Sequence, residues 1–414
     1  MIGPGAAKRA PVTPVSTPAV PTEPVAPNEL PDINPTIVAL PRSGIRELME
    51  AVWETPGALV VTAGEPSFPT PPHVVEAAHA AARAGKTTYV GETGIPELRE
   101  ALAAKIRTIN GYDAQPENIV VSAGGGEGIY AALAALLAPG EGILLPDPGW
   151  PNFAMAATML RADKKFYALD AAHDWMPDIE ELERLCDART RVLLLNAPSN
   201  PLGSTITRER LAELVAFAER RGLWILSDEC YDEIVFEGGV LSTAAVAGGL
   251  DRVISVYTFS KTYAMTGWRI GYVVAPQRAV RQIGKLQEPL ISCVNVPTQY
   301  GALAALTGPH AIVDEMVATY RGRRDAVCAM LASAGIPALR PSGAFYVWVD
   351  IGASGMNSRD FAFALLREMK VGVAPGTAFG TRGDRFVRVS LATETGTLVE
   401  AMNRLVDYLK SRET

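Results

Sequence analysis

The sequence predicts an α/β protein, with a large domain built on a mostly parallel, helix-covered sheet and a smaller α+β domain. The chain has 414 residues, more than the roughly 250–300 residues that a single hydrophobic core usually organises. From residue 118 onward, short apolar runs alternate with helical patterns. The runs are apolar through most of their length, as expected of strands that are covered on both faces. Strands that alternate with amphipathic helices predict a parallel sheet between helices.

Composition and charge exclude several classes of protein. Hydrophobic residues make up 48% of the chain and charged residues 20%, as in an ordinary soluble enzyme. The 38 basic and 45 acidic residues give a net charge of −7, which argues against a nucleic-acid partner. No apolar run approaches the ~20 residues needed to span a bilayer, and the N-terminus lacks a secretory signal pattern. We therefore expect a cytoplasmic protein without a membrane partner.

The cysteines indicate the same compartment. There are four of them, widely separated, without a CxxC pair or neighbouring histidines. This spacing favours reduced, mostly buried thiols over a disulfide framework or a zinc site, and we expect no bound metal. The four are Cys186, Cys230, Cys293 and Cys328.

The chain divides into four predicted parts. Residues 1–35 contain nine prolines and almost no large apolar side chain, so we expect a disordered or extended arm. Residues 36–62, with a helix over about 43–53, are expected to join the small domain. Residues 63–304 form the predicted large domain and residues 305–414 the predicted small C-terminal domain. We find no internal repeat.

The predicted elements follow in order. The large-domain strands are 119–121, 142–145, 191–195, 223–226, 252–256 and 270–274. Asp178 and Glu181 fit a capping box before one helix, and Thr207 caps the next. The small domain is expected to hold a helix near 309–334, a strand at 345–349, a helix near 358–369 and a strand at 385–391.

The first strand of this series ends in a run of glycines. In open α/β sheets, ligands bind beyond the carboxyl ends of the strands. Residues 124–126 are all glycine and lead into a helix, where free backbone amides bind anions. A tight turn that needs positive φ would explain the same residues. The run matches neither the dinucleotide-binding pattern nor the P-loop, so by itself it is weak support for a site.

Polar side chains follow three further strands. Asn200 comes after strand 191–195, Asp228 and Tyr231 after strand 223–226, and Lys261 and Arg269 after strand 252–256. A buried aspartate is costly to ionise unless a cation faces it. Any one of these residues would more often be structural. Four polar clusters at four strand ends are harder to explain in that way.

Together these residues suit one cofactor, pyridoxal 5′-phosphate. Its phosphate needs the glycine amides, hydroxyl groups and Arg269. Its protonated ring nitrogen needs a carboxylate, Asp228, and its phenolate oxygen needs donors, Asn200 and Tyr231. Its aldehyde needs an amine, Lys261.

With these residues the sequence resembles the fold type I, class I (aspartate aminotransferase-like) family of pyridoxal phosphate enzymes, and its bacterial branch in particular. The resemblance covers nearly everything after about residue 40. Its most specific block is Ser260-Lys261 followed by Gly267-Trp268-Arg269-Ile270-Gly271. The other matching stretches are residues 63–71, 89–99, 147–151, 341–346 and 386–390.

The resemblance implies a catalytic role for three residues. Lys261 would hold the cofactor as a Schiff base and then carry a proton during the reaction. Asp228 would pair with the ring nitrogen. Tyr231, together with Asn200, would bond the ring oxygen.

The resemblance also implies binding roles. Arg388 would bind the substrate α-carboxylate, assisted by Gly64 and Asn200. Tyr89 would reach the phosphate of the other subunit, which implies a homodimer with shared active sites. Trp150 would stack on the ring, and the phosphate would be held by Gly125, Gly126, Thr258, Ser260 and Arg269.

The implied activity is transfer of an amino group from an α-amino acid to a 2-oxo acid by a ping-pong mechanism. A lyase or ring-closing synthase with the same cofactor is the alternative, because the cofactor motifs are shared. An effector-sensing domain of a transcription regulator would need a basic winged-helix segment, which the proline-rich arm does not provide.

The sequence departs from the family pattern in three places. Thr258 replaces a common serine and keeps the hydroxyl, and Gly125 and Gly126 add no hydroxyl to the phosphate loop. Aspartate-specific members take an arginine for the distal carboxylate from the partner chain, and residues 287–290 contain no arginine or lysine. This weakens aspartate as the substrate without naming another.

Overall fold

The computed structural model of the protein describes residues 32–412. The chain forms two units, residues 1–39 and residues 40–414. In the first unit the described part holds α1 (Pro35–Val38), which Asn34 caps by accepting the Thr36 amide at 3.0 Å. Most of the predicted proline-rich arm lies outside the described residues. Everything below concerns the second unit.

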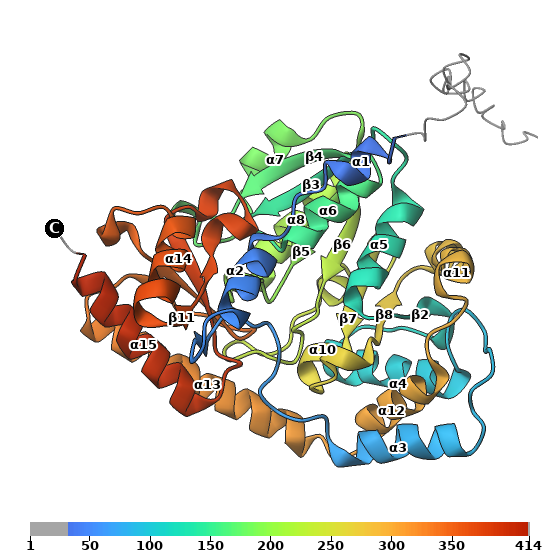
Figure 1. Ribbon diagram of the computed structural model, residues 1–414. Helices are drawn as coiled ribbons and strands as arrows, with labels where there is room; N and C mark the ends of the chain where they lie inside the picture. The colour runs from blue at the N-terminus through green and yellow to red at the C-terminus, as the bar shows by residue number, and fades with distance from the viewer. Residues whose placement is uncertain (1–31, 413–414) are drawn as a thin grey trace, which may run out of the picture. The chain divides into compact units, whose positions relative to one another are not determined.

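A seven-stranded sheet carries the strands predicted for the large domain (Figure 1). Its order is β2-β8-β7-β6-β5-β3-β4. The neighbours from β4 to β7 are all parallel, and β8 runs antiparallel to both β7 and β2. The prediction of a mostly parallel sheet in an α/β fold is confirmed. The strands are β2 (Ile119–Ser122), β3 (Gly142–Asp147), β4 (Asp163–Ala168), β5 (Thr190–Asn196), β6 (Trp224–Asp228), β7 (Val253–Thr258) and β8 (Gly271–Val274).

The edge strand β4 was not predicted. Its residues read Asp-Lys-Lys-Phe-Tyr-Ala, and its first four positions are partly or fully exposed. It therefore lacks the continuous apolar run by which the six buried strands were recognised. Charged side chains on an edge strand are a common protection against pairing with another chain.

Helices cover both faces of this sheet. On β5, Leu193 packs in one hydrophobic cluster while Val192 and Leu194 pack in the other, which explains why the strand sequences do not alternate. One face is covered by α5 (Gly125–Leu136), α6 (Pro151–Met159) and α11 (Gln277–Ile291). The other cluster includes α4 (Pro96–Lys105) and α8 (Arg208–Arg221), and the remaining helices of this part are α3 (Pro72–Arg83), α7 (Ile179–Leu185), α9 (Thr243–Val246), α10 (Phe259–Thr262) and α12 (Val296–Thr307).

The predicted helix caps are confirmed in part. Thr207 accepts the amide of Arg210 at 3.2 Å, and Asp178 accepts the amide of Glu181 at 2.9 Å. The Glu181 carboxylate, however, accepts the amide of Ala168 at 2.7 Å. The capping box is therefore only half formed, because Glu181 ties α7 to the end of β4 instead.

The C-terminal part has a sheet of its own, in the order β12-β13-β10-β9. The segment before residue 63 contributes α2 (Gly44–Trp53) and β1 (Leu59–Val60), and β1 pairs in parallel with β11. This pairing agrees with the expectation that residues 36–62 join the C-terminal part, while the domain boundaries stay a prediction. The other elements are β9 (Ala338–Leu339), β10 (Tyr346–Asp350), β11 (Val371–Gly372), β12 (Ala374–Pro375), β13 (Phe386–Ser390), α13 (Ala311–Ser333), α14 (Ser358–Met369) and α15 (Thr395–Lys410).

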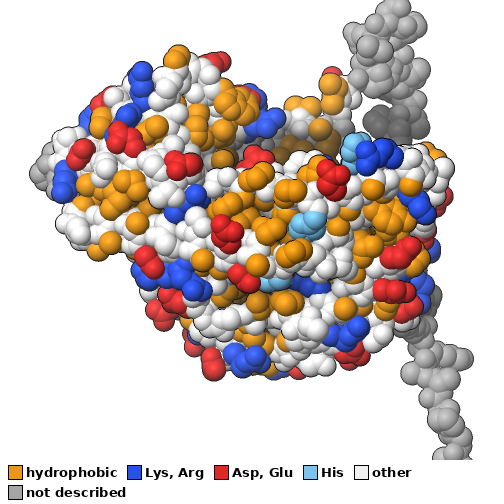
Figure 2. Space-filling view, turned by 90° about the horizontal axis from the view of Figure 1, so that it is seen from below, with side chains coloured by type: hydrophobic (Ala, Val, Ile, Leu, Met, Phe, Trp, Pro, Cys, Tyr) orange, Lys and Arg blue, Asp and Glu red, His pale blue; other side chains and the backbone are white. Residues whose placement is uncertain are grey.

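One face of the molecule shows how the charged side chains are distributed. Figure 2 shows basic and acidic side chains interspersed among apolar ones over one face of the molecule. Across residues 32–412, no helix is both long and apolar enough to cross a membrane.

The packing of helices on the sheet allows a prediction about stability. Phe217 on α8 is fully buried, whereas Phe166 on β4 is 45% exposed. Phe217→Ala is expected to lower the free energy of unfolding by about 3–5 kcal/mol, because it leaves a cavity against the sheet. Phe166→Ala is the matched control and should cost less than half as much. Denaturant titration of both variants measures this, and equal losses would contradict the assigned burial.

Candidate active site

The polar residues that follow the four strands meet in one cavity of about 350 Å³. It lies at the carboxyl ends of β5, β6 and β7 and is closed by residues from α2, β10 and β13. All but one of the site residues predicted from sequence line it: Gly64, Gly125, Gly126, Trp150, Asn200, Asp228, Tyr231, Thr258, Ser260, Lys261, Arg269 and Arg388.

Glycines form one wall because larger residues would not fit. Gly124 precedes α5 with φ +87°, and a Cβ there would lie 2.5 Å from the Arg269 guanidinium. A Cβ on Gly125 would lie 2.7 Å from the Cys230 sulfur. The turn therefore needs glycine for its backbone angle, and the wall needs glycine for close approach. The explanation by a turn with positive φ is therefore confirmed for Gly124.

Hydroxyl groups and a guanidinium lie beside this wall. Thr258 ends β7, and its hydroxyl donates to Ser260 Oγ at 2.9 Å and accepts the Ser260 amide at 3.2 Å. Arg269 donates to the carbonyl oxygen of Thr266 at 2.7 Å. Backbone amides at the start of α5, two hydroxyls and a guanidinium make an anion-binding cluster.

Lys261 stands in α10, directly after this cluster. Its Nζ donates to the carbonyl oxygen of Gly64 at 2.5 Å. The pKa of Lys261 is lowered to about 8, chiefly by burial; Arg388 and Arg269 also lower it, whereas Cys230 and Glu65 act in the opposite direction. A lysine with this pKa is partly uncharged near neutral pH and can act as a nucleophile or base.

Asp228 is a buried carboxylate at the end of β6. It is 4% exposed and accepts the backbone amide of Cys230 at 3.2 Å. Burial raises its pKa to about 6, against the lowering effect of Cys230 and Lys261. Within residues 32–412 no basic side chain forms a salt bridge with it. An ionised carboxylate in this position calls for a cationic partner.

Arg388 on β13 is a buried cation. It is 2% exposed and donates to Asn200 Oδ1 at 2.8 Å and to the carbonyl oxygen of Thr62 at 2.6 Å. Its Nε has no partner in the described structure. Burial lowers its pKa, yet a guanidinium stays charged in proteins. A buried guanidinium held only by neutral acceptors calls for an anionic ligand.

Two tyrosines complete the floor between these charges. The hydroxyls of Tyr231 and Tyr346 are 2.8 Å apart, and the Tyr346 ring centroid lies 4.1 Å from Arg388 Cζ. A Cβ on Gly64 would come within 2.6 Å of the Tyr346 hydroxyl. Burial raises the pKa of both phenols, so both are protonated near neutral pH and can donate hydrogen bonds.

Sequence reasoning missed three lining residues, Ile45, Cys230 and Tyr346. Tyr346 belongs to a matching stretch, and Cys230 lies between two predicted site residues, so a signal was present for both. Ile45 comes from α2, far away in sequence, and nothing in the sequence marks it.

Two predicted regions lie elsewhere. Tyr89 is 84% exposed and does not line the cavity, so its role across a subunit boundary stays a prediction. Gln287 on α11 is fully buried and donates to Glu127 Oε2 at 3.1 Å. Gln287 is the first residue of the stretch 287–290, which contains no arginine or lysine for a distal carboxylate, and its side chain points into the core.

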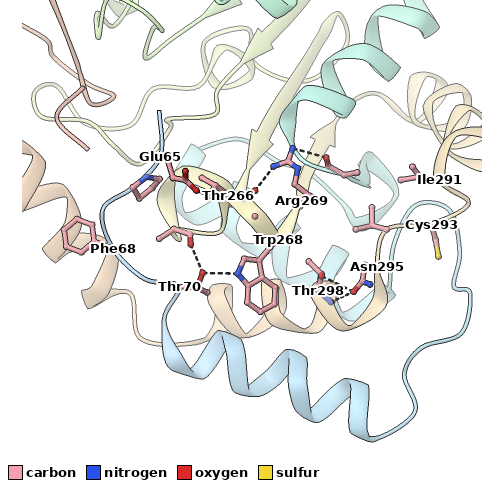
Figure 3. Close-up of a pocket in the computed structure, with 15 residues that line it drawn as sticks. Glu65, Phe68, Thr70, Thr266, Trp268, Arg269, Ile291, Cys293, Asn295 and Thr298 are labelled. Carbon is pink, nitrogen blue, oxygen red and sulfur yellow. Dashed lines mark hydrogen bonds between the residues drawn. The ribbon is translucent and has the colours of Figure 1, made fainter. Parts of the chain in front are cut away.

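Two wider cavities adjoin the site. One of about 780 Å³ shares Arg269 with it, and there Trp268 Nε1 donates to Thr70 Oγ1 at 2.9 Å (Figure 3). The other, about 550 Å³, shares Gly64, Trp150 and Lys261 with the site and adds Arg46 from α2. The amine, the buried carboxylate and the buried guanidinium all line the smallest of the three, which is therefore the candidate active site.

Comparison of the amino-acid sequence with those of known proteins identifies one family. Residues 57–405 match the family model described as aminotransferase class I and II. The chain is 36% identical to an aspartate aminotransferase of Pyrococcus horikoshii over 91% of this chain and 97% of that protein. It is also 36% identical to aromatic-amino-acid aminotransferase 2 of Thermococcus litoralis, over 90% and 96% of the two chains.

Solved structures agree. An aspartate aminotransferase of Thermotoga maritima superposes with a TM-score of 0.87 at 33% identity, covering 91% of this chain and 100% of that one. An aromatic aminotransferase of Pyrococcus horikoshii gives 0.84 at 35% identity, covering 88% and 99%. The chain therefore belongs to the class I and II aminotransferases, and it is an aminotransferase.

Proposed function

We propose that the protein is a pyridoxal 5′-phosphate-dependent aminotransferase that moves an amino group from an α-amino acid to a 2-oxo acid, with Lys261 as the residue that binds the cofactor aldehyde. The observation that carries this is the Lys261 amine, with its pKa lowered to about 8, in one cavity with a buried carboxylate and an anion-binding cluster.

The residues present fit that cofactor. The glycine wall, Ser260 and Arg269 would hold its phosphate, since Cβ atoms on the glycines would fill the space. Asp228 would hold its ring nitrogen, which supplies the missing cation. When bound, the cofactor serves as an electron sink for the substrate carbanion. Trp150, half-buried at the start of α6, would cover the ring.

The chain's own residues then have defined tasks. Arg388 binds the substrate α-carboxylate, for which its free Nε and its position in the cavity are suited. Asn200 orients Arg388 through their 2.8 Å hydrogen bond. Lys261 Nζ takes the proton from the substrate Cα, because its lowered pKa leaves it partly uncharged. Tyr231 would donate a hydrogen bond from its hydroxyl group to the ring oxygen, which favours the anionic form of that oxygen.

The assembly and the cell compartment belong to the same proposal. Tyr89 is an exposed aromatic residue on a loop, and we assign it to the phosphate site of a partner subunit in a homodimer. The four cysteines are free, which agrees with the reducing cytoplasm. We keep residues 63–304 as the large cofactor-binding domain and 305–414 as the small domain.

The amino donor is left open. The relatives are named for aspartate and for aromatic amino acids, and those substrates differ in the side chain. A lyase or synthase is the second candidate, but no feature of the cavity favours it. Incubation with amino donor alone separates the two, because transamination converts the cofactor once per site whereas a lyase releases ammonia continuously.

The lowered pKa of Lys261 is testable without cofactor. In the cofactor-free protein, an amine-directed reagent followed by mass spectrometry should modify Lys261 with a midpoint near pH 8. Lys410, whose side chain is exposed, is the internal control for the reactivity of the reagent. The pKa of Lys261 is lowered because burial disfavours the charged form of the amine. A midpoint for Lys261 equal to that of Lys410 would contradict the assignment.

Replacement of Lys261 tests the function itself. Lys261→Ala is expected to abolish the borohydride-sensitive visible absorbance and to lower turnover at least about a hundredfold, because it removes both the cofactor anchor and the base. Lys410→Ala, at an exposed position, should behave like the unmodified protein. Normal turnover in Lys261→Ala would show that the proposal is wrong.

The position of Arg46 allows a prediction about which amino-acid donors the protein prefers. On α2, Glu50 is paired with Arg42 at 2.8 Å and Glu47 with Arg359 at 2.5 Å. Arg46 lines the adjoining cavity, and its side chain makes no ion pair within the described part of the chain. Arg46→Gln should therefore lower kcat/KM for L-glutamate about tenfold more than for L-phenylalanine, through loss of a charge-assisted contact.

The control for this prediction lies on the turn before the same helix. Arg42→Gln removes a guanidinium that does not line the adjoining cavity, so both donors should keep their kcat/KM. Half-reaction kinetics with the two donors give the ratio. An unchanged ratio in Arg46→Gln would remove Arg46 from donor selection.

A further inference from the structure

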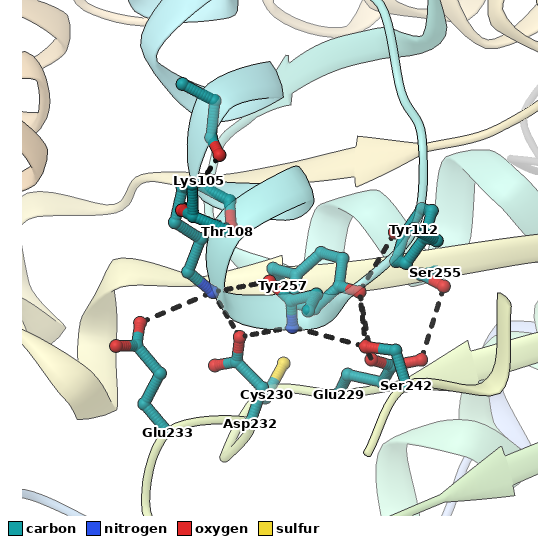
Figure 4. A network of polar contacts seen from close by, with 12 residues as sticks. Lys105, Thr108, Tyr112, Glu229, Cys230, Asp232, Glu233, Ser242, Ser255 and Tyr257 are labelled. Carbon is teal, nitrogen blue, oxygen red and sulfur yellow. Dashed lines mark hydrogen bonds and ion pairs between the residues drawn. The ribbon is translucent and has the colours of Figure 1, made fainter. Parts of the chain in front are cut away.

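The segment 228–233, which follows β6, has two sides with different surroundings. Asp228, Cys230 and Tyr231 line the active-site cavity. The other three residues, Glu229, Asp232 and Glu233, do not line it, and Figure 4 shows their carboxylates in a network with Lys105, Ser242 and Tyr257. Their side chains are buried, at 2% exposure for Glu229, 6% for Asp232 and 4% for Glu233. Three buried acids beside the catalytic residues need a physical explanation.

Lys105, the last residue of α4, faces two of these acids. Its Nζ forms an ion pair with Asp232, lies 3.3 Å from Glu233 Oε1 and donates to Asn110 Oδ1 at 3.0 Å. Asn110 donates in turn to Asp232 Oδ2 at 3.0 Å. Burial would lower the pKa of Lys105, but Asp232 and Glu233 together raise it above its usual value. The ammonium therefore stays charged and holds both carboxylates.

Glu229 is held without a cation. Its carboxylate accepts hydrogen bonds from Ser242 Oγ at 2.5 Å, Tyr257 Oη at 2.9 Å and the amide of Thr243 at 3.1 Å. Tyr257 lies on β7 immediately before Thr258, in the strand that leads to Lys261. The ring of Tyr257 lies 5.2 Å from Lys105 Nζ. The cluster thus joins the end of β6 to the end of β7.

The outer end of the cluster is a histidine. His310, which is half exposed, lies with Nε2 2.8 Å from Glu233 Oε2. Glu233 therefore has two partners, Lys105 inside and His310 at the surface, whereas Lys105 is the only basic residue of the described chain that pairs with Asp232. Loss of the Lys105 ammonium would leave Asp232 as a buried charge with only Asn110 as a donor.

We propose that Lys105 is a positioning residue of the active site: by binding Asp232 and Glu233 it fixes the part of segment 228–233 that follows Asp228, and so sets where Tyr231 stands in the cavity. The inference rests on the proposed function. The β-sheet itself holds Asp228, which pairs with Asn196 on β5 and with Val256 on β7. After Asp228 the backbone bonds are Glu229 N to Val256 O at 2.9 Å, Asp232 N to Glu229 O at 3.0 Å and Ile234 N to Tyr231 O at 2.9 Å. The side chains of Asp232 and Glu233 add anchors to the part of the segment that has left the sheet and carries Tyr231.

A buried ion pair by itself is weak support for such a role. Replacing both partners by neutral groups is often neutral for stability, whereas removing one partner leaves a buried charge and destabilises the fold. Two effects of Lys105 must therefore be separated: balancing the charge of Asp232, and holding the segment in place. A pair of variants separates them.

The experiment compares Lys105→Met, the double variant Lys105→Met with Asp232→Asn, and Lys165→Met. Lys165 pairs with Asp187 at 2.7 Å near the sheet edge and is the matched control for loss of an ion pair away from the site. Four quantities are measured: thermal stability, amide hydrogen exchange of residues 228–234 without cofactor, the dissociation constant for pyridoxal phosphate, and the pH midpoint of the visible band of the loaded protein.

Lys105→Met should raise the dissociation constant about tenfold and lower kcat with little change in KM, because sub-ångström displacement of catalytic groups costs activity. Exchange of residues 228–234 should become faster. The visible band should change at higher pH, since a displaced Tyr231 donates less well to the ring oxygen. Lys165→Met should leave all of these quantities at the values of the unmodified protein.

The double variant decides between the two effects. If it recovers thermal stability but keeps fast exchange and weak cofactor binding, Lys105 acts by positioning. If it recovers all of them, the single variant suffered only from the unpaired charge and the inference is wrong. Unchanged exchange in Lys105→Met would also overturn it. Failure of the unmodified protein to bind pyridoxal phosphate would instead overturn the proposed function, and the exchange measurement would still test Lys105.

Discussion

Two buried charges of opposite sign face the same cavity without a counter-ion in the described chain. Asp228 belongs to the large sheet and Arg388 to the C-terminal sheet, and both are at most 4% exposed. Each is held only by neutral groups, a backbone amide for Asp228 and an amide and a carbonyl oxygen for Arg388. Charges kept in this way are costly in the free protein. The arrangement makes sense when a ligand brings the complementary charges, a ring nitrogen at one place and a carboxylate at the other.

The same burial gives Lys261 its chemistry. Removal from water disfavours its ammonium form, and two guanidinium groups nearby act in the same direction. Asp228 shows the opposite shift for the same physical reason, because burial disfavours its carboxylate. Burial in a medium of low dielectric constant thus brings the pKa of Lys261 and the pKa of Asp228 closer together. The ion pairs of Lys105 with Asp232 and Glu233 lie behind segment 228–233. Rigid support of this kind matters because catalytic groups act only when they are held in a fixed position.

Much of this could be predicted from the sequence, and the failures have identifiable causes. The six buried strands were found because both of their faces are apolar, and β4 was missed because its exposed positions are charged. Glu181 was expected to complete a capping box, but tertiary contact offered it the amide of Ala168 instead. The site residues at the strand ends were found because parallel strands end at one edge. Ile45 and Lys105 were not found, because each reaches the site or its support from a distant helix.

The sequence by itself determined the fold class, the family and most of the residues that line the candidate active site, since these depend on local periodicity and on residue types at fixed spacing. Only the tertiary structure decided how those residues behave. The pKa of Lys261, the absence of counter-ions for Asp228 and Arg388 within residues 32–412, and the ion pairs of Lys105 with Asp232 and Glu233 all depend on burial and on contacts across long sequence separations. Desolvation is a property of the packed chain, and it cannot be assigned to a residue before the packing is known.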